Sequence, residues 1–148
     1  MKTFKKVLIG VGIPLVLLAI LILFVMLLSG DKGFQRAGSE METFEFLGQS
    51  LQVRVADGRA ERVRGLSGTE RLAFDEGMLF AFDRPDFHGI WMKDMSYALD
   101  IVWFDEEYSI VHTEENVTPE TYPKVFRPDR ESWYVLELPA GWLEKYQK

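Results

Sequence analysis

The feature that most constrains the fold of this chain is a run of 22 residues without a charge, at positions 7–28 (VLIGVGIPLVLLAILILFVMLL). As an α-helix the run would be about 33 Å long, and the hydrocarbon core of a bilayer is about 30 Å thick. A cleaved signal peptide has a shorter apolar region and a small residue where this chain has Leu28. The run therefore predicts an uncleaved transmembrane anchor, with a cleaved signal peptide as the alternative.

The residues around the apolar run predict its orientation and the domain organisation. Three lysines precede the run, and a basic flank of this kind favours a cytoplasmic N-terminus. The predicted location is therefore the cell membrane, crossed once, with the folded part outside the cytoplasm. The predicted segments are a cytoplasmic N-terminus at 1–6, the anchor at 7–28, a polar tether at 29–40 and one β-rich domain at 41–148.

Charge and composition exclude several classes of function. All 23 acidic residues follow the apolar run, against 14 of the 17 basic residues, so this part has a net charge of −9. Such a surface argues against nucleic acid as a partner. The chain has no cysteine, which excludes disulfides and thiolate chemistry. Its two histidines, His88 and His112, lack a metal-site spacing, and no phosphate or dinucleotide loop is present, so we predict no metal and no cofactor.

Alternation of apolar and polar residues predicts a fold dominated by β-strands. Residues 50–56 (SLQVRVA) alternate as a half-buried strand does, and 43–48 form the matching hairpin partner. Three later segments, 77–82, 87–92 and 98–104, are apolar on both faces and predict strands that are covered on both sides.

Two short helices complete the prediction. One covers 58–66, with Asp57 as its N-cap and with Ala60 and Val63 facing the core, and the other begins near 140. The predicted fold class is therefore α+β and β-dominated. We expect a small barrel-like or highly curved sheet of about six to seven strands with two short helices, preceded by one N-terminal transmembrane helix.

Two carboxylates are predicted to lie on apolar strand faces. Asp100 shares its face with Val102 and Phe104, and Glu137 shares its face with Val135. Burying such a charge is costly unless it is paired or hydrogen-bonded.

Two interpretations of these carboxylates stay open. The groups are internal staples that fix the strand order, with Lys93 and Arg64 as partners. Alternatively, they line one pocket with Trp91 and Trp103 as apolar walls, where they could share acid–base work.

Three segments carry a resemblance to a known family. RGLSGTERLAFDEGMLFAF, IWMKDMSYALDIVWFD and YVLELPAGWLEKY resemble domain of unknown function family number 192, an exported bacterial and archaeal family, over about residues 50–146. The resemblance implies a compact β-rich fold, often behind a signal or anchor segment, and it implies no activity. Recurrent family positions fall on Arg64, Trp91, Lys93, Asp100 and Glu137. The chain departs from the family at Asp94-Met95, where relatives tend to have Asn-Thr.

These observations lead to one leading functional hypothesis and two alternatives. The leading hypothesis is a non-enzymatic domain that binds a small molecule, glycan or peptide in an aromatic-walled groove. One alternative is a cofactor-free hydrolase or lyase that uses Asp100 and Glu137, and the other is an assembly module that binds a protein partner of the cell envelope. The candidate ligand-binding residues are Arg64, Trp91, Lys93, Asp94, Asp100 and Glu137.

Overall fold

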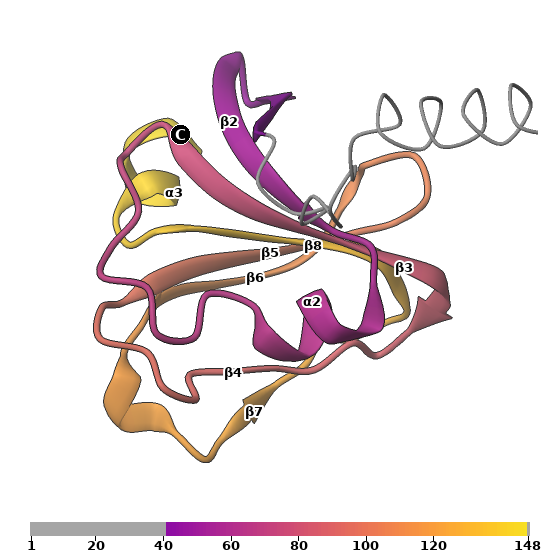
Figure 1. Cartoon of the computed structure of the whole chain (residues 1–148). Helices are drawn as coiled ribbons and strands as arrows, with labels where there is room; N and C mark the ends of the chain where they lie inside the picture. Colours follow the sequence, from indigo (N-terminus) through magenta and orange to yellow (C-terminus); the bar gives the residue numbers. More distant parts are fainter. Residues whose placement is uncertain (1–40, 148) are drawn as a thin grey trace, which may run out of the picture. The chain divides into compact units, whose positions relative to one another are not determined.

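The structure, a computed structural model, describes residues 41–147 (Figure 1). The predicted anchor and tether lie outside these residues. In the described part, no helix has the length and apolar character needed to cross a membrane. The elements are β1 (Met41–Phe46), β2 (Gln49–Ala56), α2 (Arg59–Arg64), β3 (Glu76–Asp86), β4 (Ile90–Trp91), β5 (Leu99–Phe104), β6 (Ile110–Val117), the 3-10 helix η1 (Pro119–Thr121), β7 (Val125–Phe126), β8 (Ser132–Pro139) and α3 (Trp142–Tyr146).

Six strands form one sheet in the order β1-β2-β3-β8-β5-β6. All neighbours are antiparallel except β2 and β3, which are parallel and are connected through α2. Strands β4 and β7 form a separate two-stranded ribbon. The prediction of a β-dominated fold with two short α-helices is confirmed. The sheet does not close into a barrel, because its edge strands β1 and β6 do not pair with each other.

Each face of the sheet carries its own hydrophobic core. On one face, Phe80, Ile101 and Val135 pack with residues from the segment after α2 and from the β4–β7 ribbon. On the other face, Val102 and Leu138 pack with Trp142 and Leu143 of α3. Every residue of β5 is buried, as its doubly apolar sequence predicts. The two faces matter for function because successive strand residues alternate between them.

Helix α2 presents a different face to the sheet from the predicted one. Its N-cap is Gly58, whose N–H donates to the Glu61 carboxylate (3.1 Å), and not Asp57. Ala60 is exposed, and Val63 is 67% exposed. Arg62 is half-buried instead, because its guanidinium donates to the Ala81 carbonyl (2.8 Å) of β3. Because the backbone carbonyl of β3 needs a hydrogen-bond donor, the arginine faces the sheet. The apolar side chains Ala60 and Val63 therefore point away from the sheet.

Candidate functional site

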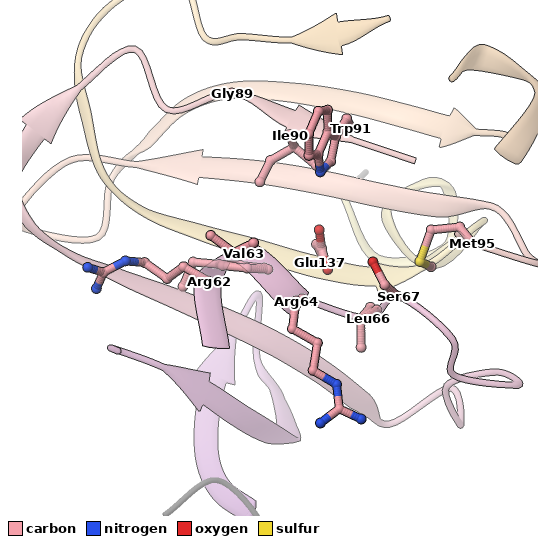
Figure 2. A pocket seen from close by; sticks show the side chains of 12 residues that line it. Arg62, Val63, Arg64, Leu66, Ser67, Gly89, Ile90, Trp91, Met95 and Glu137 are labelled. Atoms are coloured by element: carbon pink, nitrogen blue, oxygen red, sulfur yellow. The ribbon is translucent and has the colours of Figure 1, made fainter. Parts of the chain in front are cut away.

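A small cavity of about 50 Å³ lies between α2, the β4 ribbon and the centre of β8 (Figure 2). This space holds a few water molecules or one small functional group. The segment from Arg62 to Ser67 forms one wall, and Gly89 to Trp91 form part of the opposite wall. Glu137 is the one carboxylate among the lining residues.

Glu137 projects from β8 between α2 and Trp91 (Figure 2). The residue is 5% exposed, and its Oε2 atom is buried without a hydrogen-bond partner among the described residues. Burial raises the pKa of Glu137 to about 8, and the nearby charge of Arg54 opposes this rise. The carboxyl is therefore mainly neutral at pH 7, and it carries a proton that it can donate.

Strand register explains why the charge of Arg54 affects the pKa of Glu137 although the two side chains form no ion pair. Arg54 of β2 is aligned with Met78 of β3, and Met78 is aligned with Glu137 of β8. The two charged residues thus share a row across the sheet but are separated by one strand. Neighbouring strands are about 4.8 Å apart, so Arg54 acts on Glu137 through space, and no ion pair joins them in residues 41–147.

Trp91 forms an exposed apolar wall of the cavity. It is 46% exposed, and its ring contacts Tyr122 edge-on, with 6.1 Å between ring centroids. Lys93 places its Nζ 5.9 Å from the centroid of the Trp91 ring. A tryptophan held in this way offers a flat surface to a ligand at the mouth of the cavity.

The remaining polar candidates occupy different positions around the mouth. Arg64 ends α2 and lines the cavity, but its guanidinium points away from Glu137 in Figure 2. Lys93 and Asp94 are exposed and do not line the cavity. The backbone carbonyl of Asp94 accepts a hydrogen bond from the Gly68 N–H (2.9 Å), which ties the two cavity-flanking segments together. The pairing of Lys93 or Arg64 with a buried carboxylate, expected from the sequence, does not occur within 41–147.

Asp100 does not belong to the site. Its carboxylate accepts hydrogen bonds from the backbone N–H groups of Asn116 (2.8 Å) and Leu143 (2.9 Å). These bonds tie β5 to β6 and to the first turn of α3. Asp100 is therefore an internal staple, held by backbone donors and not by the cation that the sequence suggested.

Asp100 and Glu137 lie on opposite faces of the sheet. The register pairs Ile101 with Glu137 and Asp100 with Leu138, and the partners Ile101 and Leu138 belong to different cores. The hypothesis that the two carboxylates share acid–base work is wrong for this reason. Trp103 is not a pocket wall either, since it is fully buried and its Nε1 donates to the His88 carbonyl (2.8 Å).

Comparison with protein families gives a match over nearly all of the described residues. The model of the family described as DUF192, Uncharacterized ACR, matches residues 42–147. The chain belongs to the DUF192 family. The resemblance expected from its motifs is thereby confirmed, and no curated protein matches the sequence.

Two crystal structures resemble the DUF192 domain. One is a protein of Sinorhizobium meliloti 1021, provisionally named a transcription regulator, with 28% identity and a TM-score of 0.63, covering 70% of this chain and 81% of its own. The other is a protein of unknown function from Novosphingobium aromaticivorans DSM 12444, with 23% identity and a TM-score of 0.65, covering 71% and 75%. The second likeness shows the fold alone.

Several lining residues of this DUF192 domain were not predicted as site residues from the sequence. Gly65, Ser67, Gly89 and Met95 line the cavity, but none has an unusual chemistry or spacing. A glycine on each side of the cavity was the one available signal, because glycine is used where backbone segments approach closely.

Substituting Gly89 with alanine tests how tightly the β4–β7 ribbon closes the cavity wall. The new Cβ would lie 2.6 Å from Cγ1 of Val125 and 2.7 Å from Nη1 of Arg127, so these side chains or the ribbon that carries Val125 must move. We expect a loss of about 1–3 kcal/mol in the free energy of unfolding, measured by urea denaturation. The double variant Gly89→Ala/Val125→Ala removes the Val125 methyl group, leaves the Arg127 contact in place and should therefore recover part of this loss. If the loss in unfolding free energy of the double variant equals the sum of the losses in Gly89→Ala and Val125→Ala, the clash between these two positions does not cause the destabilisation.

Proposed function

We propose that this protein is a membrane-anchored, extracytoplasmic binding domain that holds a small polar group of its ligand beside Glu137. The observation that carries the proposal is the carboxyl of Glu137, a residue that lines the cavity and whose buried Oε2 atom lacks a hydrogen-bond partner within residues 41–147. An unsatisfied buried polar atom is costly. A ligand that supplies the missing hydrogen bond would recover this cost.

The walls of the cavity support binding of a ligand larger than the group that enters. Trp91 and Val63 are 46% and 67% exposed on opposite sides of the mouth. Exposed apolar side chains around a recess with few polar groups are typical of ligand sites. In this proposal the ligand places one group in the cavity, and its remaining part lies against Trp91.

The proposed membrane anchoring is supported by the N-terminal sequence. The charge-free run at 7–28 is long enough to span a bilayer, and the preceding lysines favour export of the domain after the run. The high acidic content of that domain argues against DNA as its ligand. We therefore do not extend the provisional name of the Sinorhizobium relative to this chain.

Replacing Trp91 with alanine tests the proposed site. Full-length protein in mild detergent is melted against a panel of glycans, peptides and small metabolites. A ligand at about 100 times its Kd stabilises the fold by roughly 2.7 kcal/mol, a shift of several degrees. We expect Trp91→Ala to abolish this shift while leaving the unliganded melting temperature nearly unchanged.

Phe74→Ala is the matched control, because Phe74 is 42% exposed and does not line the cavity. This variant should keep the ligand-induced shift. A shift that survives Trp91→Ala, or that disappears in both variants, would place the binding surface elsewhere.

A second candidate function is general acid–base catalysis by Glu137 without Asp100. The observation that favours it is the pKa of Glu137, which burial raises to about 8, as is common for catalytic acids. A hydrolytic or eliminating activity lost in Glu137→Gln and kept in Asp94→Asn would support catalysis. Ligand turnover that is undetectable under saturating binding would support the binding domain.

A further inference from the structure

We propose that the group recognised in this cavity is a carboxylate or a similar small anion, which accepts a hydrogen bond from Glu137 while Arg64 turns toward its charge. This inference rests on the proposed function and adds the chemical class of the ligand. It depends on the protonation of Glu137, on the charges around the mouth and on the size of the cavity.

The first step concerns the hydrogen-bonding capacity of Glu137. Arg54 on β2 is the cation whose charge acts on it, and burial outweighs that charge. Tyr97, in the loop before β5, lies close enough for the Glu137 charge to help raise its own pKa, after the larger effect of burial. Strand β4 contributes no titratable group to the cavity. A neutral carboxyl has one O–H donor in addition to its acceptor oxygen, and an acceptor in the cavity is the partner that uses this donor.

The second step concerns the cations of α2. Arg62 is already engaged, since its guanidinium donates to the Asp57 and Ala81 carbonyls and pairs with Asp83 (3.3 Å). Arg64 is exposed, and within residues 41–147 its guanidinium has no hydrogen-bond or ion-pair partner. It can therefore rotate toward a bound anion without breaking a hydrogen bond or an ion pair of the described residues. Arginine is well suited to this role because its planar fork matches a carboxylate.

The third step concerns the electrostatic balance at the mouth. Apart from Glu137, no acidic side chain of the described region lines the cavity, whereas Arg62 and Arg64 do. Arg62 is paired with Asp83, and Lys93, beside the Trp91 ring, is followed by Asp94, so the net positive charge at the mouth is that of Arg64. This local excess of positive charge stands out in a chain with 23 acidic and 17 basic residues. It attracts anions and opposes the entry of ammonium groups.

An amine is the main competing ligand, and it is less well matched. An ammonium group would bind most strongly to the ionised form of Glu137, because the neutral carboxyl offers it only an uncharged acceptor oxygen. At pH 7, ionising a group with a pKa of about 8 lowers the affinity about tenfold. The amine would also approach past the cations of the mouth. An anion requires no ionisation of Glu137, and the cations of the mouth attract it.

The volume limits what enters the cavity to about one carboxylate. With about 50 Å³ available, the rest of the ligand must remain outside, against Trp91. The carboxylate could belong to a peptide C-terminus or to an acidic sugar or other small organic acid. These sources share the recognised group and differ in the part of the molecule to which it is attached.

The test uses three probes with the same ring and different end groups: phenylacetate, phenylacetamide and phenethylamine. Binding to the full-length protein in mild detergent is measured by calorimetry from pH 5.5 to 9.5. We expect phenylacetate to bind most tightly, with a constant affinity below about pH 8 and a tenfold loss per pH unit above it. We expect phenethylamine to bind weakly at every pH.

Variants separate the roles of the two residues. Glu137→Gln keeps an N–H donor, so it should bind phenylacetate within a few-fold of wild type at pH 6 and lose the pH dependence above 8. Arg64→Ala should weaken phenylacetate about tenfold. Arg71→Ala is the control, because Arg71 is exposed and does not line the cavity.

Three outcomes would overturn the inference. Phenethylamine that binds more tightly as the pH rises and loses binding in Glu137→Gln would identify a cation site, and the proposed binding function would survive. Phenylacetate binding that is insensitive to Arg64→Ala and to pH would place the anion elsewhere. If no probe binds while the panel yields a ligand that depends on Trp91, the binding function again survives without the anion.

The source of the carboxylate is decided by two further comparisons. A short peptide with a free C-terminus is compared with its amidated form, and glucuronate is compared with glucose. If only the free peptide is preferred over its amide, the source is a peptide C-terminus. If only glucuronate is preferred over glucose, the source is an acidic sugar. Equal binding of both members in both pairs would overturn the inference.

Discussion

Replacing Asp100 with alanine should lower the free energy of unfolding by about 3–5 kcal/mol, the largest loss that we expect from a single substitution in this domain. Asp100 is 1% exposed, and its two carboxylate oxygens accept hydrogen bonds from Asn116 and Leu143. Its removal leaves the buried backbone N–H of Leu143 and the part-buried N–H of Asn116 without their acceptor, and it removes the hydrogen bond that joins the first turn of α3 to the sheet. Urea denaturation of the full-length protein in mild detergent measures the loss.

Asp105 provides a matched control for this prediction. Its carboxylate also accepts hydrogen bonds from two backbone N–H groups, those of Glu107 (3.1 Å) and Ser109 (2.7 Å). Those donors lie in an exposed turn, where water can replace the carboxylate. Asp105→Ala should therefore cost about 1 kcal/mol or less. Equal losses in both variants would show that burial of the donors is not what makes Asp100 important.

Replacing Glu137 with glutamine should make the domain more stable than wild type at alkaline pH. The pKa of Glu137 is raised from 4.5 to about 8 in the folded state, chiefly by burial. Below about pH 4.5 the carboxyl is protonated in both states, and its contribution to stability is fully present. Between pH 4.5 and 8 the unfolded chain ionises while the folded chain stays protonated, so this stability is lost as the pH rises.

The expected magnitude depends on the size of the pKa difference. Each pKa unit corresponds to about 1.4 kcal/mol, so the gain in Glu137→Gln relative to wild type should grow toward at most about 5 kcal/mol at pH 8. Denaturation of both proteins in urea at pH 4.5, 6, 7 and 8.5 measures this growth. A constant difference between Glu137→Gln and wild type would mean that Glu137 ionises normally.

The strand pattern of this domain was readable because it depends on local alternation. Strand β5 is apolar on both faces in the sequence and is buried on both faces in the structure. The alternating residues of β2 pair with β1 as the predicted hairpin. The β4 strand was harder to predict, because the apolar segment 87–92 contributes only Ile90–Trp91 to a strand, and residues 87–89 connect this strand to β3.

The face of α2 illustrates where local reasoning fails. Apolarity alone assigned Val63 to the core, yet Arg62 occupies the inner face because β3 offers it a backbone carbonyl. In a helix of six residues, a single hydrogen-bonded side chain outweighs the weak periodicity of two small apolar residues. The exposed Val63 that results is part of the candidate site.

The family, the β-dominated fold class and the two carboxylates on apolar strand faces could all be read from local residue patterns. That Asp100 is a staple and that Glu137 lines a cavity became clear in the folded domain alone. The two residues look alike locally, but the donors that satisfy Asp100 come from positions 16 and 43 residues away. Glu137 lies on the opposite face, where the packing of α2 against the β4 ribbon leaves it without a donor in the described chain. Whether a buried charge is satisfied depends on distant backbone groups, which one sequence does not place.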